Sequence, residues 1–256
     1  ADPASQWTAA RKGPAFFAYS DNYLIDTDHG IIMDVDASRS IRQAEVGAMR
    51  KMIDRTEERF GIKPHWIAAD TAYGSSENLV WLTLKRQILP FIPVFDNSKR
   101  KDGTWPRADF TWDENNDRYI CPEGKELRHT RRNYSDPARN THGMKARNYG
   151  ALKSDCQVCP SKAKCCPNTD TRRIRREKYE IVRDFARACT ASEFNPKAQA
   201  RRKKVEMLFA HLKRILGLGR LRLRGPCGVQ DEFTLAAIAQ NLRKLTKLKP
   251  MVTTTG

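Results

Sequence analysis

The stretch "WIAADTAYGSSENL", residues 66–79, passes from an apolar segment directly into an acidic residue. The run from Trp66 to Ala69 predicts a buried strand, and Asp70 follows at its carboxyl end. A carboxylate at the end of a buried strand costs free energy unless another group pairs with it or coordinates it. We therefore expect Asp70 to have a partner elsewhere in the chain, such as a metal ion that offsets its charge.

The segments around this strand predict alternating strands and helices. Asp34 and Asp36 alternate with apolar neighbours, as in a strand with one solvent-exposed face, and Asp26 belongs to a turn. The last strand is apolar throughout, which indicates burial on both faces. The pattern predicts an α/β fold with a mixed sheet flanked by helices. Strands are expected at 15–25, 31–37 and 88–95, and helices at 43–60 and 76–85.

Beyond Asp96 the sequence becomes polar and rich in turn-forming residues, and regular patterns return near Asn195. We expect a loop-rich insert with short hairpins between these points, closed by a helix near 176–189. Two further helices are predicted at 195–217 and 231–248. The predicted organisation is a first core segment at 1–95, a cysteine-containing insert at 96–195 and a helical core segment at 196–256.

The net charge of +17 is concentrated in the second half of the 256-residue chain. Residues 1–120 have 16 Lys and Arg against 18 Asp and Glu, whereas residues 121–256 have 31 against 12. Such a basic half suits a polyanion, most simply nucleic acid bound through its phosphates, and the alternative is a solvated basic surface. No run of about 18 apolar residues is present, so no membrane-spanning helix is predicted.

Five of the seven cysteines are clustered within residues 121–166 of the insert, and their spacing is typical of a metal site. Cys156 and Cys159 form a Cys-x2-Cys pair, which places two thiolates on one tight turn for tetrahedral zinc. Cys121 and either Cys165 or Cys166 would complete four ligands. The alternative is a set of buried, redox-inert cysteines. A zinc ion at this place would be structural and would hold together a small basic module.

A single acid, Glu206, lies in the strongly basic stretch 197–224. A helix advances by about 100° per residue, so Arg202 and Lys213 share one stripe with Glu206. A helical glutamate between basic residues is commonly a surface ion pair worth under about 1 kcal/mol. Together with Asp70, however, Glu206 would supply carboxylates that hold two Mg²⁺ ions for phosphoryl transfer.

Three segments of the chain resemble a known protein family: "AADTAYGSSENL", "RRKKVEMLFAHLKRILGLGRLRLRG" and "AAIAQNLRKL". The resemblance covers almost the whole chain, including "CPEGKEL" and "DCQVCPSKAKCC" in the insert. These segments are similar to the DDE-type transposases of bacterial insertion sequences, which have an RNase H-like catalytic core. In that family the second acid closes the fourth core strand, which corresponds to Asp70. The third acid lies in a Tyr-x2-Arg-x3-Glu-x6-Lys signature that Arg202, Glu206 and Lys213 match, whereas Gln199 stands at the tyrosine position.

The resemblance implies metal-dependent cleavage of DNA at transposon ends, followed by strand transfer from the freed 3′-hydroxyl. Asp70 and Glu206 would be catalytic ligands of Mg²⁺ in a two-metal site, and the partner would be double-stranded DNA of the transposon ends and the target. The complete protein would act as a homodimer in the bacterial cytoplasm, associated with the nucleoid when it is bound to DNA. The residues expected to contact DNA are Arg201, Arg202, Lys203, Lys204, Lys213, Arg220, Arg222 and Arg224.

The first acid of the family lies on a strand that precedes the hairpin at 15–37. Asp2 is the only acid ahead of that hairpin in this chain, and we place it in the connector after the first strand. We therefore expect the first acid upstream of residue 1, which would leave this fragment a poor catalyst by itself. The alternatives are a non-catalytic DNA-binding remnant of the same element and a zinc-ribbon nucleic-acid-binding module.

Overall fold

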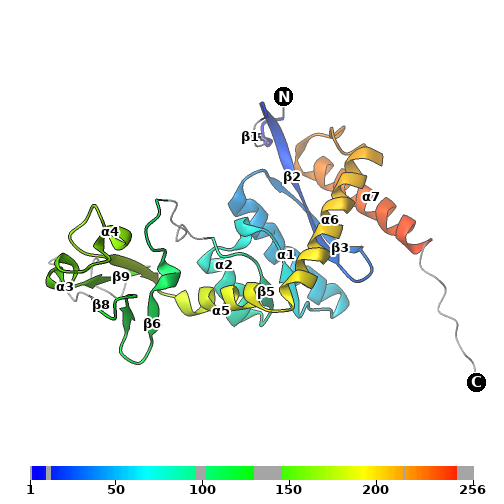
Figure 1. The fold of residues 1–256 in the computed structure, drawn as a ribbon. Helices are drawn as coiled ribbons and strands as arrows, with labels where there is room; N and C mark the ends of the chain where they lie inside the picture. The colour runs from blue at the N-terminus through cyan, green and yellow to red at the C-terminus, as the bar shows by residue number, and fades with distance from the viewer. Residues whose placement is uncertain (1, 10–12, 96–101, 130–145, 216, 247–256) are drawn as a thin grey trace, which may run out of the picture. The chain divides into compact units, whose positions relative to one another are not determined.

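A computed structural model describes residues 2–9, 13–95, 102–129, 146–215 and 217–246 (Figure 1). Internal contacts divide the chain into two compact units, residues 1–93 together with 186–256, and residues 94–185. The first and last predicted segments therefore contribute to one unit, and the clustered cysteines lie in the other. Residues 216, 247 and 248, at the ends of two predicted helices, lie outside the described part of the chain.

The strands of the first unit form two separate sheets. β1 (Gln6–Ala9), β2 (Ala15–Asp26) and β3 (Ile31–Arg39) form an antiparallel sheet with β2 in the middle. β4 (Trp66–Ala68) and β5 (Leu89–Phe91) form a parallel pair. The expected α/β character is confirmed, although the described strands of this unit make two sheets and not one.

The strand β2 has different partners along its length. Residues 15–18 pair with β1, and residues 19–26 pair with β3, with a register shift between Leu24 and Ile25. Beyond Ala18, the edge of β2 that faces away from β3 pairs with no other described strand. This edge becomes a wall of the candidate site.

The helices of the first unit begin and end close to their predicted positions. α1 (Arg42–Phe60) ends at Gly61, whose φ of 64° is the left-handed conformation that glycine readily adopts after a helix. The predicted helix at 76–85 is α2 (Ser76–Val80) continued by a π turn, η2 (Trp81–Lys85). α6 (Asn195–Ile215) and α7 (Gly225–Leu245) follow, and α7 begins earlier than predicted because Pro226 suits the first helical turn.

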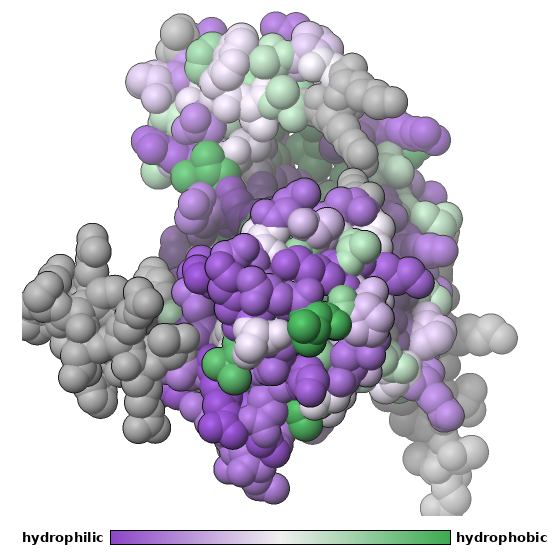
Figure 2. All heavy atoms as spheres, turned by 60° about the vertical axis from the view of Figure 1, so that its left-hand side comes forward, coloured by the Kyte–Doolittle hydropathy of each residue, from purple (hydrophilic) through white to green (hydrophobic). Residues whose placement is uncertain are grey.

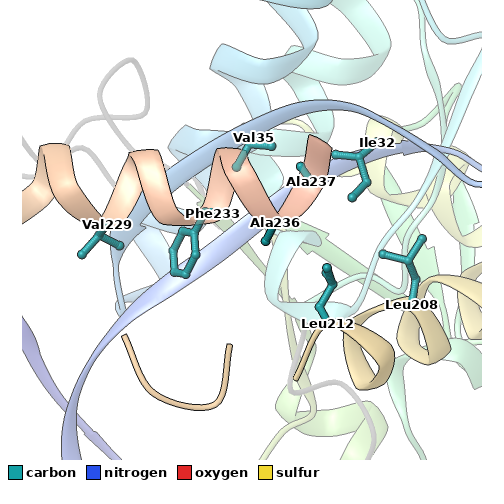
Figure 3. Close-up of a cluster of buried hydrophobic side chains, with 8 residues drawn as sticks. All are labelled: Ile32, Val35, Leu208, Leu212, Val229, Phe233, Ala236 and Ala237. Atoms are coloured by element: carbon teal, nitrogen blue, oxygen red, sulfur yellow. The ribbon is translucent and has the colours of Figure 1, made fainter. Parts of the chain in front are cut away.

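One face of β3 contributes to a hydrophobic cluster of the first unit (Figure 3). Its side chains pack against α6 and α7, and all members of the cluster are buried. Replacing one buried leucine of such a core by alanine typically costs about 2–5 kcal/mol. The core therefore fixes α6, the helix that contains Glu206, against this sheet. The cluster consists of Ile32 and Val35 of β3, Leu208 and Leu212 of α6, and Val229, Phe233, Ala236 and Ala237 of α7.

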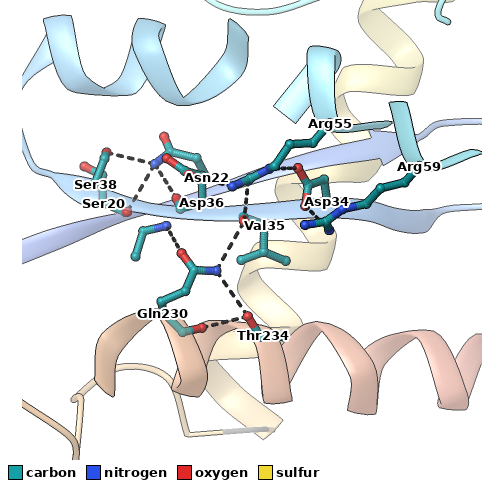
Figure 4. Close-up of polar contacts among 11 residues, drawn as sticks. Ser20, Asn22, Asp34, Val35, Asp36, Ser38, Arg55, Arg59, Gln230 and Thr234 are labelled. Atoms are coloured by element: carbon teal, nitrogen blue, oxygen red, sulfur yellow. Dashed lines mark hydrogen bonds and ion pairs between the residues drawn. The ribbon is translucent and has the colours of Figure 1, made fainter. Parts of the chain in front are cut away.

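The opposite face of β3 carries charge and is covered by α1 (Figure 4). Arg55 Nε donates to Asp34 at 2.7 Å, and another guanidinium nitrogen lies 3.1 Å from Asp36. Arg55 also donates to the Val35 carbonyl at 2.9 Å, which accepts a second bond from Gln230 of α7 at 3.2 Å. The prediction of a solvent-exposed face is wrong, because the Asp34 and Asp36 side chains are only 9% and 11% exposed under α1.

Removing Arg55 should destabilise the protein far more than removing its neighbour Arg59. In the Arg55→Ala variant two nearly buried carboxylates lose their cation, which typically costs about 3 kcal/mol or more of the free energy of unfolding. The Arg59 side chain is 60% exposed and lies 3.8 Å from Asp34, so Arg59→Ala should cost less than about 1 kcal/mol. Urea unfolding followed by circular dichroism measures both losses, and equal losses would contradict this structure.

The second unit contains a five-stranded antiparallel sheet where mainly loops were expected. The predicted short hairpins are present as β6–β7 and β7–β8. This unit also contains the short helices η3 (Arg107–Asp109), α3 (Lys153–Gln157) and α4 (Lys162–Cys165). The helix α5 (Glu180–Ala191) follows the last strand of the sheet in the sequence. In spatial order the strands are β10 (Arg173–Glu177), β9 (Ala146–Ala151), β8 (Glu126–His129), β7 (Arg118–Ile120) and β6 (Thr111–Asp113).

Aromatic side chains and cysteines together form the core of this second unit. Phe110, Tyr119, Leu127 and Tyr149 are buried with three of the cysteines.

The face of the molecule in Figure 2 is mostly hydrophilic, with isolated hydrophobic residues. None of the helices described here is both long and apolar enough to cross a membrane.

Candidate functional site

A cavity of about 530 Å³ in the first unit brings together the two acids predicted from the sequence. Its walls come from residues 21–28, from residues 63–70 around β4, and from α1 and α6. Asp70 follows β4 and Glu206 lies in α6, and both line this cavity. A third acid, Asp21 of β2, lines it as well. Asp26 and Asp28 line the cavity too, but Asp26 is hydrogen-bonded to His29 and Asp28 forms an ion pair with Arg201. Carboxyl groups from three separate parts of the chain therefore surround one volume.

Asp70 is exposed, and the prediction that it lies buried at a strand end is wrong. Its Oδ1 accepts the backbone N–H of Ala72 at 2.7 Å, so its side chain caps the 3-10 turn η1 (Thr71–Tyr73). The strand β4 is only three residues long and half-buried, and the chain turns toward solvent directly after it. Capping thus explains the position of Asp70 without a metal ion.

Glu206 forms an ion pair with Arg202, one helical turn earlier, at 3.4 Å. The Glu206 side chain is 61% exposed, so this pair contributes little to stability. Leu208 and Leu212 are buried in the core, which leaves Glu206 on a part of α6 that borders the cavity. The sequence allowed a surface ion pair as the alternative role of Glu206. This ion pair is present, and it lies at the cavity.

Asp21 is the residue of this cavity that sequence reasoning missed. Its Oδ1 is buried and has no hydrogen-bond partner among the described residues. Burial raises the pKa of Asp21 from its ordinary value of 3.8 to about 7, and the neighbouring Tyr23 hydroxyl and the positive charge of Lys213 oppose this rise. Because Ser20 and Asn22 on either side are also polar, the local pattern does not indicate that Asp21 faces a cavity.

The raised pKa of Asp21 predicts a pH-dependent stability. The folded protein holds this proton more tightly than the unfolded chain, so the stabilisation is complete below about pH 4 and is lost as the pH rises through about 7. The Asp21→Asn variant stays neutral at every pH. The difference in free energy of unfolding, variant minus unmodified protein, should therefore rise between pH 5 and 7 and stay constant at higher pH. Urea titrations at several pH values measure this difference. The exposed Asp231→Asn serves as the control, and a pH-independent difference for Asp21→Asn would contradict the raised pKa.

The donor set of this cavity suits a divalent cation that prefers oxygen ligands. Asp21, Asp70 and Glu206 offer only carboxylate oxygens, which are the protein ligands of Mg²⁺. The unpaired Oδ1 of Asp21 is one acceptor that such an ion would satisfy. Within the described ranges, however, no three metal-ligating side chains are already gathered into a metal-binding group.

Asp2 has a structural role at another place in the first unit. Its carboxylate accepts the N–H of Ala4 at 3.1 Å, the hydroxyl of Tyr19 at 3.1 Å and the N–H of Gly225 at 2.8 Å. The hydrogen bond from Gly225 holds the pKa of Asp2 below its usual value. The described residues that line the cavity do not include Asp2.

The basic residues predicted to contact DNA differ in how firmly they are held. Arg201 forms an ion pair with Asp28, and its guanidinium lies over the Trp66 ring at 5.5 Å from the centroid. Arg202 pairs with Glu206. The remaining six are exposed, three of them in α6 and three in the segment that connects α6 with α7: Lys203, Lys204, Lys213, Arg220, Arg222 and Arg224.

All five clustered cysteines surround one small cavity of the second unit. Cys156, Cys165 and Cys166 are buried, and burial, with Cys166 nearby, raises the pKa of Cys165 to about 12. Cys121 Sγ accepts the N–H of Lys125 at 3.2 Å, in a tight turn of the kind that presents a thiolate to a metal. The predicted zinc ligands thus line one cavity, without forming a ready metal-binding group among the described residues.

A comparison with protein families matches residues 120–246 to the model of the transposase DDE domain. The chain is related to the DDE-type transposases. The matched part of the chain contains the cysteine segment and the Arg202, Glu206 and Lys213 signature, whereas Asp70 precedes it. Searches among curated proteins and among solved structures found no match. A transposase DDE domain implies DNA as the partner of this protein.

Proposed function

We propose that the complete protein is a metal-dependent transposase that cleaves DNA at transposon ends and joins the freed 3′-hydroxyl to a target. The observation that carries this proposal is the cavity shared by Asp70 and Glu206, which lie 136 positions apart in the chain. Carboxylates at such a place are what two-metal phosphoryl transfer requires. By the family resemblance, the complete protein would act as a homodimer on double-stranded DNA in the bacterial cytoplasm.

Asp70 and Glu206 would hold the metal, since their oxygens border one cavity. Mg²⁺ bound there would activate the attacking oxygen and stabilise the leaving oxygen of an in-line displacement. Arg202 and Lys213 would bind phosphates of the DNA strand. Because Arg202 is paired with Glu206, a phosphate that takes over Arg202 would leave the Glu206 carboxylate free for the metal.

We also propose an RNase H-like core in which one more strand joins the two sheets of the first unit. Among the described strands, β4 pairs only with β5, and β2 beyond Ala18 pairs only with β3. Both unpaired edges border the cavity, and such edges accept an added strand. An additional strand that pairs with these edges would bring the first acid of the family next to Asp21.

Asp70→Ala and Glu206→Ala should each reduce DNA cleavage by the complete protein by on the order of 10³-fold or more, because each removes a metal ligand. DNA binding should remain within a few-fold of the unmodified protein, since neither change removes a cation. Cleavage of a labelled transposon-end duplex and anisotropy on the same duplex measure the two effects.

Matched controls are Asp231→Ala in α7 and Glu58→Ala in α1, two exposed acids outside the cavity lining. Both should cleave like the unmodified protein. Full cleavage activity in Asp70→Ala or Glu206→Ala would contradict the assignment of these two residues as catalytic metal ligands.

A non-catalytic DNA-binding remnant is the second candidate function, and the exposed ion pair of Glu206 with Arg202 favours it. Titration with Mg²⁺ or Mn²⁺ separates the two functions. Binding of the metal that disappears in Asp70→Ala and Glu206→Ala supports the enzyme. Absence of metal binding by the complete protein supports the remnant.

We further propose that four of the clustered cysteines hold a structural zinc ion in the second unit. Thiolates are preferred zinc ligands, and Cys121, Cys156, Cys159 and Cys165 line one cavity. Cys166 lines it too and is an alternative to Cys165. Zinc would bind thiolates in place of protonated thiols and would release protons on binding.

Purified protein should contain about one zinc ion per chain, and Cys156→Ser should lose it. A chelator should lower the melting temperature, because a structural site contributes its binding free energy to folding. Cys189→Ser, which changes a cysteine outside the cluster, is the control and should keep its zinc. A metal-free protein that melts at an unchanged temperature after chelation would favour inert cysteines.

A further inference from the structure

A second cavity of the first unit, about 430 Å³ in volume, lies next to the first, between residues 25–30, α6 and α7. We call it the α6–α7 cavity. Ile25, Val205 and Leu208 form its apolar wall. Its volume falls within the range of about 300–1,000 Å³ that is typical of small-molecule sites. The described residues that line it do not include Asp70 or Glu206, so it has no part in the proposed metal chemistry.

Two polar side chains in this cavity have unused hydrogen-bonding capacity. Gln240 of α7 is only 6% exposed, and its Oε1 has no partner among the described residues. Both ring nitrogens of His211 in α6 are also buried, and neither has a partner within the described ranges. Unpaired buried polar atoms destabilise a protein unless a ligand or water satisfies them, so their position in a cavity wall points to a bound molecule.

The rim of the α6–α7 cavity is basic. Lys204, Arg243 and Lys244 line it, and no ion pair within the described residues holds any of the three. The fourth cation, Arg201, is paired with Asp28. The absence of a side chain at Gly30 leaves room for Lys244, because a Cβ at position 30 would lie 3.0 Å from the Nζ of Lys244. A basic rim around a partly apolar interior suits an anion that carries a flat, hydrogen-bonding group.

We propose that the α6–α7 cavity binds one unpaired nucleotide of a DNA strand. The phosphate lies at the rim with Lys204, Arg243 and Lys244, where charge-assisted hydrogen bonds form. The base enters the cavity, packs on the apolar wall and hydrogen-bonds to His211 and Gln240. A base paired and stacked in a duplex does not reach such a pocket, so the site selects unpaired or extruded nucleotides. This inference rests on the proposed function only in taking DNA as the bound polymer.

The test compares two labelled duplexes of equal length, one fully paired and one with a single unpaired nucleotide. Fluorescence anisotropy at fixed salt should show that the 256-residue protein prefers the second by about tenfold. Lys204→Ala should reduce this preference. Lys203→Ala changes the adjacent lysine of α6, which is not among the cavity residues, and should weaken both duplexes equally and keep the preference.

His211→Leu should abolish the preference while the melting temperature stays unchanged or rises, because the change removes two unpaired polar atoms. A merely structural histidine would instead show a lower melting temperature and an intact preference. If this variant does not fold, the pair of lysine variants decides alone.

Equal affinity of the unmodified protein for both duplexes would overturn the proposal, and so would equal loss of preference in the two lysine variants. The mononucleotide dAMP should compete with the unpaired duplex better than inorganic phosphate does. Equal competition would mean that the base has no role, which also overturns the proposal. Asp70→Ala should keep the preference, so a failure of the catalytic assignment is distinguishable from a failure of this one.

Discussion

The burial of β3 on both faces is the constraint on which the first unit depends. On one face Val35 packs with α6 and α7, and on the other face two carboxylates require a cation that only α1 supplies. The Val35 carbonyl accepts hydrogen bonds from both sides, from Arg55 and from Gln230, so the same residue ties α1 and α7 to the strand (Figures 3 and 4). Nearly buried ion pairs tolerate little displacement, because an unpaired charge in that position is costly. Since β2 pairs with β3 along residues 19–26, the cavity wall that contains Asp21 is held by the same contacts.

The helix α6 connects this core with both cavities. Leu212 is buried against β3 and α7, while Arg202 and Glu206 border the cavity that Asp70 shares. Lys204 and His211 border the α6–α7 cavity. A helix turns through a full circle every 3.6 residues, so neighbouring positions of one basic stretch reach different sides. In the proposed function, one rigid helix therefore positions a metal ligand, a phosphate contact and a nucleotide pocket relative to each other.

The sequence predicted local elements well and their surroundings less well. The ranges of α1, β2 and β3 follow from periodicity and end signals, which depend on neighbouring residues only. The surroundings of Asp34 and Asp36 were wrong, because alternation identifies a polar face but does not distinguish water from a helix that supplies Arg55. The burial of Asp70 was wrong for a related reason, since four apolar residues do not show where a short strand meets solvent. The sheet of the second unit was missed because its strands are short and rich in charged residues.

By itself, the sequence determined the α/β character, the basic half of the chain, the cysteine spacing and the relation to DDE-type transposases, since these depend on composition and on spacing along the chain. Only the tertiary structure decided which acids share a cavity: Asp21 joins Asp70 and Glu206 there, whereas Asp2 is hydrogen-bonded elsewhere, to Tyr19 and to Gly225. The periods of 2 and 3.6 residues report the face of one element. Convergence of distant residues depends on how hydrophobic contacts orient whole elements against each other, and no local pattern contains that information.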